Sequence, residues 1–312
     1  MMTWRYFFYV CCLFFIISSC EEPYTPSTLE SEQEIVVEGY VEAGEESNPV
    51  FVLITKSIPF ISKIDPGKFS ELFVKGAKVS VNDGDKTIQL TEVCLSQIPD
   101  PLKEEVYQIL GFNPDSINLD LCIYADIFNQ IKREPGRKYD LEIRLVDKVL
   151  TASTTIPRPV SLKNFKWTET PGIPNDTLAR LLVTIEDPKD EANYYRYFTA
   201  QGDENLVPPF GSVRDDALFN GQTFEFPLQR AERRGGDFTP ETFGFFKRGQ
   251  MAKIKWSSID KAHFDFWNTR DFNANSGGPF ASYIRINFNI KGGIGIWGGY
   301  ASETYNLMVP PR

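Results

Sequence analysis

The hydrophobic pattern from residue 34 onward is one of short strands. Apolar runs rich in β-branched and aromatic residues alternate with polar residues or are bounded by turn residues. In the first half, strands are expected at 35–41, 50–54, 77–81, 87–90, 141–145 and 149–152. Asn82-Asp83-Gly84-Asp85 is a hairpin turn signal between the third and fourth of these, and Val146-Asp147-Lys148 marks a second hairpin between the fifth and sixth. About seven strands in about 120 residues predict a sandwich of the immunoglobulin or fibronectin type.

The second half continues as strands and contains one helical pattern. Strands are expected at 165–167, 181–185, 193–198, 251–256, 283–290 and 305–309. Residues 259–268 predict a short helix with Asp260 at its start. The glycine-rich stretch from Gly292 to Tyr300 is expected to bulge or to lie close to another backbone.

A second helical pattern interrupts the first half. Residues 101–111 begin with proline, carry early acidic residues, place apolar residues at helical spacing and end in glycine. Pro157 and Pro159 indicate a domain boundary, because paired prolines end strands and stiffen linkers. The expected fold is mainly β: a β-sandwich domain with a short helical insertion at 34–157, then a β-rich domain with one short helix at 158–312.

The N-terminal residues resemble a bacterial lipoprotein signal. Arg5 precedes an unbroken apolar run at 7–17, which is shorter than the roughly 20 residues that span a bilayer. Ile17-Ser18-Ser19-Cys20 follows, an aliphatic residue and two small residues before a cysteine. We expect a signal peptide at 1–19, lipidation of Cys20 and a flexible tether at 20–33. An ordinary secretory signal with a chance cysteine is the alternative.

The net charge limits which partners the protein can bind, and the cysteines indicate a disulfide. A formal charge of −9 argues against nucleic acid and against electrostatic binding to an anionic membrane, so a lipid on Cys20 would supply the membrane attachment. Cys94 and Cys122 are the cysteines that remain, and an even pair in an exported protein is typical of a disulfide. This bond would close the helical insertion where it leaves and re-enters the sheet; two free buried thiols are the alternative. The sequence has no CxxC or Cys/His cluster, and we expect neither structural zinc nor any cofactor.

Several fragments occur in an order that resembles a known family. They are 36–40, 78–84, Cys94 with 122–124, 154–157, 187–188, 193–196, Asp260 with 266–267, and above all the glycine-rich 292–300. The family is that of the Bacteroidetes outer-membrane lipoproteins with domain of unknown function 4249, and the resemblance covers essentially the whole chain after the signal. Its members are commonly found beside TonB-dependent outer-membrane transporters. The resemblance therefore implies a non-enzymatic accessory or binding subunit of such a receptor, and it supplies no catalytic residues.

The resemblance also bears on location and modification. In similar lipoproteins acidic residues after the cysteine accompany display at the cell exterior, and Glu21 and Glu22 are in that position; a simple acidic tether is the alternative. The triplets at 115–117 and 176–178 resemble the Bacteroidetes O-glycosylation sequon, which would modify Ser116 and Thr177; ordinary polar turns are the alternative.

Two other functions remain open, an outer-membrane assembly or structural factor and a surface hydrolase. The hydrolase has little support, because His263 is the only histidine and no nucleophile elbow accompanies it, so we expect His263 on a helix surface. The G-x-G-x-x-G match at 293–298 is followed by only fourteen residues, too few for a dinucleotide fold. Residues 82–85 and 215–216 offer oxygen atoms but no calcium loop.

Two aromatic groups are candidate partner contacts. Phe245 and Phe246 lie in a segment rich in arginine and glycine, and either contact a partner or pack into the second domain. Trp297 and Tyr300 lie among glycines; a core position is favoured slightly, and an interface anchor is the alternative. The residues identify no ligand.

Overall fold

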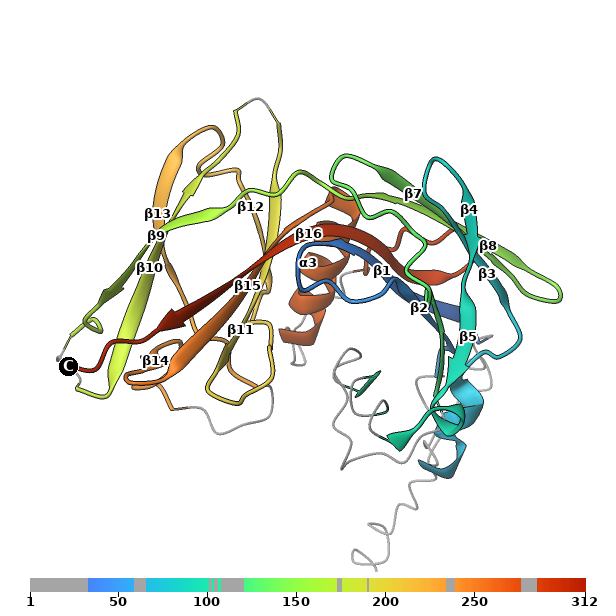
Figure 1. Cartoon of the computed structure of the whole chain (residues 1–312), viewed down its shortest axis with the longest axis horizontal. Helices are drawn as coiled ribbons and strands as arrows, with labels where there is room; N and C mark the ends of the chain where they lie inside the picture. Colours follow the sequence, from blue (N-terminus) through green and yellow to red (C-terminus); the bar gives the residue numbers. More distant parts are fainter. Residues whose placement is uncertain are drawn as a thin grey trace, which may run out of the picture. The chain divides into compact units, whose positions relative to one another are not determined.

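Strand β16 (Ile294–Met308) joins strands from both ends of the chain (Figure 1). Its first half pairs in parallel with β1 (Ile35–Ala43), and its second half pairs antiparallel with β15 (Met251–Ile259). The result is one eight-stranded sheet in the order β12-β11-β15-β16-β1-β2-β6-β5. The computed structural model describes residues 33–58, 66–100, 103, 106–107, 121–172, 176–189, 191–233, 239–275 and 285–312.

The remaining strands complete this sheet and form two smaller ones. The other members of the central sheet are β2 (Phe51–Lys56), β5 (Thr91–Cys94), β6 (Cys122–Ala125), β11 (Tyr194–Gln201) and β12 (Val213–Asp215). One smaller sheet contains β3 (Lys78–Asn82), β4 (Thr87–Gln89), β7 (Lys138–Arg144) and β8 (Val149–Thr155). The other contains β9 (Leu162–Thr168), β10 (Leu178–Glu186), β13 (Thr223–Leu228) and β14 (Phe246–Lys247). The described helices are α3 (Lys261–Asn275) and the short η2 (Pro66–Leu72) and η3 (Leu95–Gln97).

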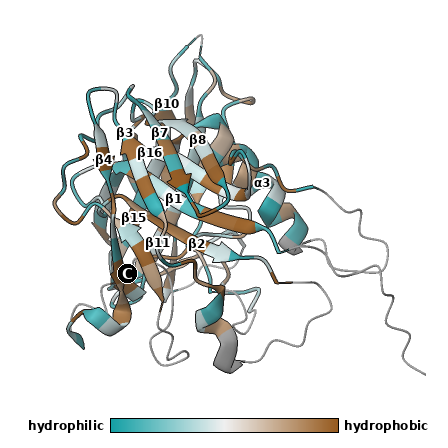
Figure 2. Ribbon diagram, turned by 90° about the vertical axis from the view of Figure 1, so that its right-hand side faces the viewer, coloured by the Kyte–Doolittle hydropathy of each residue, from teal (hydrophilic) through white to brown (hydrophobic). Residues whose placement is uncertain are grey.

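Alternating side chains bury one face of most strands. In β7 the even spacing of Tyr139, Leu141 and Ile143 places all three in the interior, while the residues between them are more exposed. Figure 2 shows this alternation of hydrophobic and hydrophilic positions along the strands. The protein is therefore mainly β, as the pattern predicts, and none of the described helices has the length and apolar character needed to cross a membrane.

Two large hydrophobic cores lie against the central sheet, together with a smaller cluster of Phe51, Leu95, Leu121, Ile123 and Ala125. The first contains residues of β1, β2, β3, β7 and β8, together with Trp297 and Ala301 of β16. The second contains residues of β10, β11 and β15, with Val309 beyond the end of β16. Each core belongs largely to one of the two regions expected on either side of residue 157. The central sheet nevertheless crosses that boundary, because β1 pairs with β16.

The glycine-rich stretch forms the first half of β16. Gly295 has a φ of +119°, and a Cβ at this position would lie 1.9 Å from the carbonyl oxygen of Val37. A glycine is required here by both the backbone conformation and the close approach of β1, which confirms the expected contact with another backbone.

The prediction of a strand at 283–290 is wrong for the residues of this range that the structure describes. Residues 285–290 are not in a strand, and 283–284 lie outside the described residues. The Asn289 side chain instead bonds the backbone of Trp297, accepting from its N–H at 2.8 Å and donating to its carbonyl at 2.7 Å. A side-chain amide thus replaces a strand along this edge of β16.

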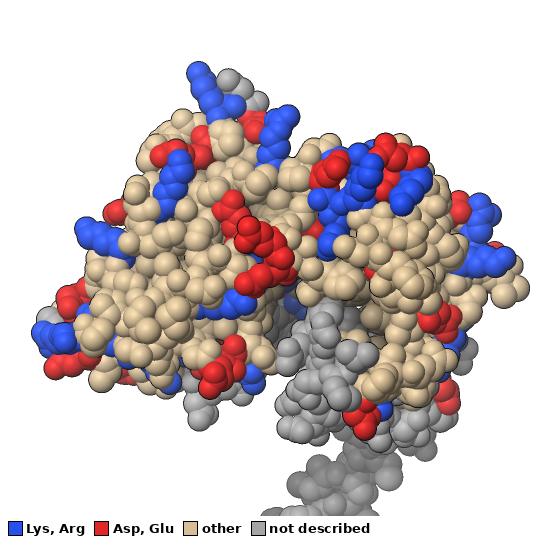
Figure 3. All heavy atoms as spheres, viewed as in Figure 1, with Lys and Arg blue, Asp and Glu red and all other residues tan. Residues whose placement is uncertain are grey.

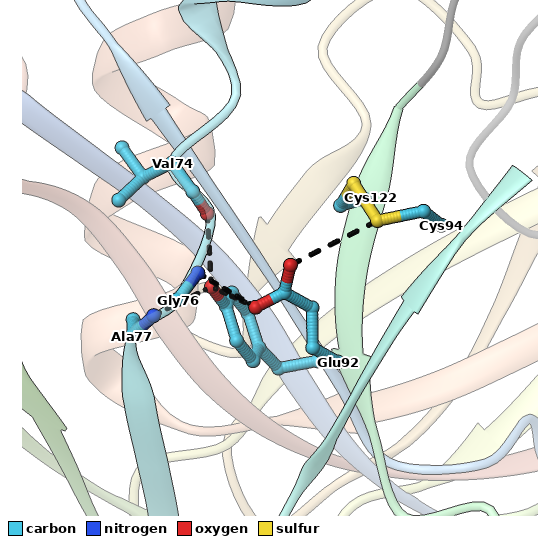
Figure 4. Close-up of a disulfide and its surroundings, with 7 residues drawn as sticks. Val74, Gly76, Ala77, Glu92, Cys94 and Cys122 are labelled. Carbon is cyan, nitrogen blue, oxygen red and sulfur yellow. Dashed lines mark hydrogen bonds between the residues drawn. A yellow bond between two sulfur atoms is a disulfide. The ribbon is translucent and has the colours of Figure 1, made fainter. Parts of the chain in front are cut away.

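The predicted hairpins, the second-half helix and the disulfide are confirmed. Cys94 and Cys122 lie opposite each other on β5 and β6 and are joined by a disulfide (Figure 4). Nearby, the Tyr124 hydroxyl lies 2.9 Å from the carbonyl oxygen of Val74 and 3.1 Å from a carboxylate oxygen of Glu92. Of the helical insertion at 101–111, residues 103, 106 and 107 are helical and the others lie outside the described residues.

Candidate functional site

One face of the central sheet carries polar and aromatic side chains where α3 lies against it (Figure 1). Strand pairing brings them together: Glu42 lies opposite Tyr300, and Arg196 lies opposite Ser257. We call the following residues the polar layer: Tyr40, Glu42, Arg196, Ser257, His263, Trp267 and Tyr300. The first and second cores contain the alternate residues of these strands, so the sheet separates the polar layer from these two cores. Tyr40 also packs against the smaller hydrophobic cluster around Phe51.

Helix α3 is fixed on this face at its first turn. Asp260 precedes the helix, and its carboxylate accepts the backbone N–H of His263 at 2.8 Å. The other carboxylate oxygen accepts the hydroxyl of Thr154 at 2.5 Å and the N–H of Thr155 at 3.4 Å, both from β8. Burial raises the pKa of Asp260 against the effect of these hydrogen bonds. One residue therefore caps the helix and connects it to the first core.

His263 is buried between two tyrosine rings. Its ring lies 5.4 Å from that of Tyr40 and 5.5 Å from that of Tyr300, and the side chain is 2% exposed. Gly298 makes room for it, since a Cβ there would lie 2.7 Å from the Nδ1 atom of His263. The expected surface position is therefore wrong, because the missing side chain of a glycine on β16 leaves a space that the imidazole fills.

The surroundings of His263 keep it uncharged. Neither ring nitrogen has a hydrogen-bond partner among the described residues. Burial, and then the positive charge of Arg196, lower the pKa of His263 well below its usual range. Ser257, the serine of the polar layer, forms its hydrogen bond with the hydroxyl of Ser302 at 2.8 Å and not with His263. The histidine is thus a neutral aromatic spacer between the helix and the sheet.

Arg196 is a buried cation held by aromatic rings. Its guanidinium carbon lies 3.6 Å from the centre of the Trp267 ring and 4.8 Å from that of Phe198. Its Nε has no hydrogen-bond partner among the described residues. Burial lowers the pKa of Arg196. Cation–π contacts of this kind contribute about 0.5–2 kcal/mol, less than the penalty of burying an unpaired charge.

Glu42 connects the polar layer to a groove on the surface. It is 2% exposed, and Lys255 lies 2.6 Å from one of its oxygens. The other oxygen accepts the hydroxyl of Tyr300 at 3.1 Å. Burial and this carboxylate raise the pKa of Tyr300 well above its usual range, so the phenol stays protonated and donates.

The groove has a volume of about 660 Å³ and lies where β1 ends beside β16. We call it the edge groove; its charged lining consists of Glu42, Glu45, Glu46, Glu303 and Arg133. Arg133 donates to Ser47 and to the backbone carbonyl of Asn48, each at 2.8 Å. This arginine therefore holds the loop that follows β1 and leaves the carboxylates in excess in the groove.

The structure separates the residues that the sequence singles out. Trp297 and Phe246 are fully buried in the first and second cores, so of the two alternatives left open for each, the core position holds and the partner contact does not. Tyr300 belongs to the polar layer and is partly buried, as is Phe245. Thr177 is exposed, whereas Cys20 and Ser116 lie outside the described residues.

Sequence reasoning missed the roles of Arg196, Trp267 and Glu42. The sequence did contain an indication for two of them, because Arg196 and Trp267 each lie in a fragment that carries the family resemblance. Nothing in a strand pattern, however, indicates that a charged residue faces a helix rather than solvent.

A comparison with family models gives one match, to a domain of unknown function (DUF4249), over residues 21–306. The chain belongs to the DUF4249 family. The matched region of this DUF4249 chain contains every residue of the polar layer and of the charged lining of the edge groove. No curated protein and no solved structure matches the chain.

Proposed function

We propose that this DUF4249 chain is a lipid-anchored outer-membrane lipoprotein, displayed at the cell exterior, that serves a TonB-dependent transporter as a non-enzymatic binding subunit. The observation that supports a binding role best is the edge groove, a charged depression formed by the ends of β1 and β16. Both strands are central members of the largest sheet, so the wall of the groove that β16 forms is held by the sheet.

The state of the single histidine supports a non-enzymatic role. A general base must reach a proton and titrate near working pH. His263 is buried, bonds to no described residue through its ring, and has a pKa far below that range. A spacer role between helix and sheet accounts for these features without a reaction.

The membrane attachment is proposed from the N-terminal sequence. Ile17-Ser18-Ser19-Cys20 provides the cleavage and lipidation pattern, and the residues up to 33 would tether the folded body. Cys20→Ala should leave an unprocessed precursor that takes up no labelled palmitate, because the thiol that receives the lipid is absent. Cys20→Ser is a second variant with the same expectation, and normal labelling of either would contradict the lipoprotein assignment.

The receptor association is tested by co-purification. A tagged chain, extracted from outer membranes with mild detergent, should recover a large β-barrel receptor in stoichiometric amount. Recovery of soluble proteins alone would contradict the proposal. Loss of many unrelated surface proteins on deletion of the gene would instead support an assembly factor.

A further inference from the structure

Strand β16 is paired on only one side along its second half. Its pairing with β1 ends where Ala43 meets Ala301, whereas its pairing with β15 continues to Met308. The chain turns away from β16 at Gly44, where a Cβ would lie 2.5 Å from the carbonyl oxygen of Ser302. Between residues 302 and 308, the side of β16 on which β1 lay is therefore an open strand edge.

The hydrogen bonds at both ends of the β15 pairing show which backbone groups face the open edge. Asp260 donates its N–H to the carbonyl of Gly299, and the N–H of Val309 donates to the carbonyl of Gln250. In antiparallel pairing the backbone groups of alternate residues face opposite sides. Those of odd-numbered residues thus face β15, and those of Thr304, Asn306 and Met308 face the open edge.

This edge opens into the edge groove. Thr304 and Asn306 line the groove together with Gly44, Glu45 and Glu46. The first half of β16 differs, because there the side chain of Asn289 covers the edge that β15 does not reach. The edge in the groove forms no corresponding bond within the described part of the chain.

Residues 302–308 of the open edge contain neither lysine nor proline and form no bulge. Exposed edges are usually protected by lysine, proline, a bulge or a covering segment. The register of residues 302–308 (SETYNLM) with β15 is continuous. Their unpaired N–H and C=O groups therefore remain able to accept another strand.

Charge indicates the kind of strand that fits. Four carboxylates line the groove against one arginine. Lys255 and Lys253 neutralise Glu42 and Glu46. Glu303 accepts the hydroxyls of Ser161 and Tyr305. Glu45, in contrast, is exposed and forms no ion pair with a described residue. Figure 3 shows a group of acidic side chains near the middle of the face in view. Lysine or arginine side chains on an incoming strand would complement this lining.

We propose that the edge groove binds an extended, basic segment of a partner protein, which adds to the central sheet as a strand along residues 302–308 of β16. The segment's backbone bonds Thr304, Asn306 and Met308, and its basic side chains lie against Glu45. This inference deepens the proposed binding role and rests on it.

The test uses the purified full chain and a labelled peptide of about ten residues with alternating lysine and valine. In fluorescence anisotropy it should bind at least about tenfold more tightly than a matched peptide of alternating glutamate and valine. Asn306→Pro removes one N–H from the open edge without touching the pairing with β15, and should weaken binding of the basic peptide by about tenfold. Asn306→Ala is the matched control, because it keeps that N–H and should bind like the wild type.

Three outcomes would overturn the inference. Equal binding by Asn306→Pro and Asn306→Ala, with both variants folded by circular dichroism, would show that the edge does not pair. Equal binding of the basic and acidic peptides would remove the charge argument. A dimer of the wild type that Asn306→Pro abolishes would assign the edge to a second copy of the chain. If the peptide binds as expected but no receptor co-purifies, the proposed function fails and the strand-addition site stands.

Discussion

At the scale of single residues, Trp297 and Phe246, two of the four aromatic side chains that the sequence left between core and interface, belong to the cores. Trp297 has no exposed surface, and its indole N–H donates to the carbonyl of Tyr139 at 3.1 Å. A Cβ on Gly39 would lie 3.0 Å from the indole ring, so the neighbouring strand leaves little free space around it. The side chain thus connects β16 to β7 by packing and by a hydrogen bond.

Trp297→Ala is therefore expected to lower the free energy of unfolding by about 3–5 kcal/mol, the range for large aromatic residues in cores. Chemical denaturation measures the effect. Val146→Ala is the control, since Val146 is fully exposed and its loss should change stability by no more than about 0.5 kcal/mol. A Trp297→Ala protein as stable as the control would contradict the core role.

His263 gives the chain a pH dependence whose sign follows from its burial. Its pKa in the folded protein is well below 6.5, whereas the unfolded chain takes up a proton near that value. Below about pH 6.5 the unfolded state therefore binds more protons than the folded state. The free energy of unfolding has its highest value above this pH and decreases as the pH is lowered. Because it is the only histidine, His263→Phe should flatten this dependence between about pH 7 and 5.5. The free energy of unfolding of both proteins is measured by urea denaturation at several pH values. An equal dependence on pH in the two proteins would contradict this assignment.

The polar layer shows the limit of sequence reasoning at this scale. Asp260 was recognisable as the start of a helix, because a helix start has a local signal. The burial of His263 and Arg196 had none, since it depends on Gly298 and Trp267 from other parts of the chain. The residues of a candidate site could thus be named in part from the sequence, but not brought together.

At the scale of elements, strand faces were predictable and strand partners were not. Alternation identified most strands, and turn residues identified the two hairpins, which are local. The parallel pairing of β1 with β16 joins residues more than 250 positions apart, and alternation fixes only which face is buried. For the same reason, the glycine stretch could be predicted to lie close to another backbone, but β1 could not be identified as that backbone.

Gly295→Ala tests this pairing. The substitution places a Cβ against the carbonyl of Val37 in a backbone conformation that alanine rarely adopts, so we expect loss of several kcal/mol or no folded protein. Gly84→Ala is the matched control, because Gly84 also has a positive φ, +93°, but has open space around it. The control should lose about 1–2 kcal/mol, the conformational cost alone. Similar losses in both variants, measured by urea denaturation, would show that the close approach of β1 is not what requires Gly295.

At the scale of the whole molecule, the two halves share one sheet although each has its own core. The first core contains Ile290, Trp297 and Ala301, which all lie after residue 157. A fragment of residues 34–157 would keep most of the first core but lose the parallel partner of β1 and the indole that fills the space beside Gly39. We expect this fragment alone to lack a cooperative unfolding transition, because open pairing groups and a large void would remain in its main sheet. Coexpression with residues 158–312 should restore the transition, measured by circular dichroism against urea, and the fragment carrying Val37→Asp should not be restored. Cooperative unfolding of residues 34–157 on their own, with the stability of the full chain, would show that β16 is dispensable for the first core.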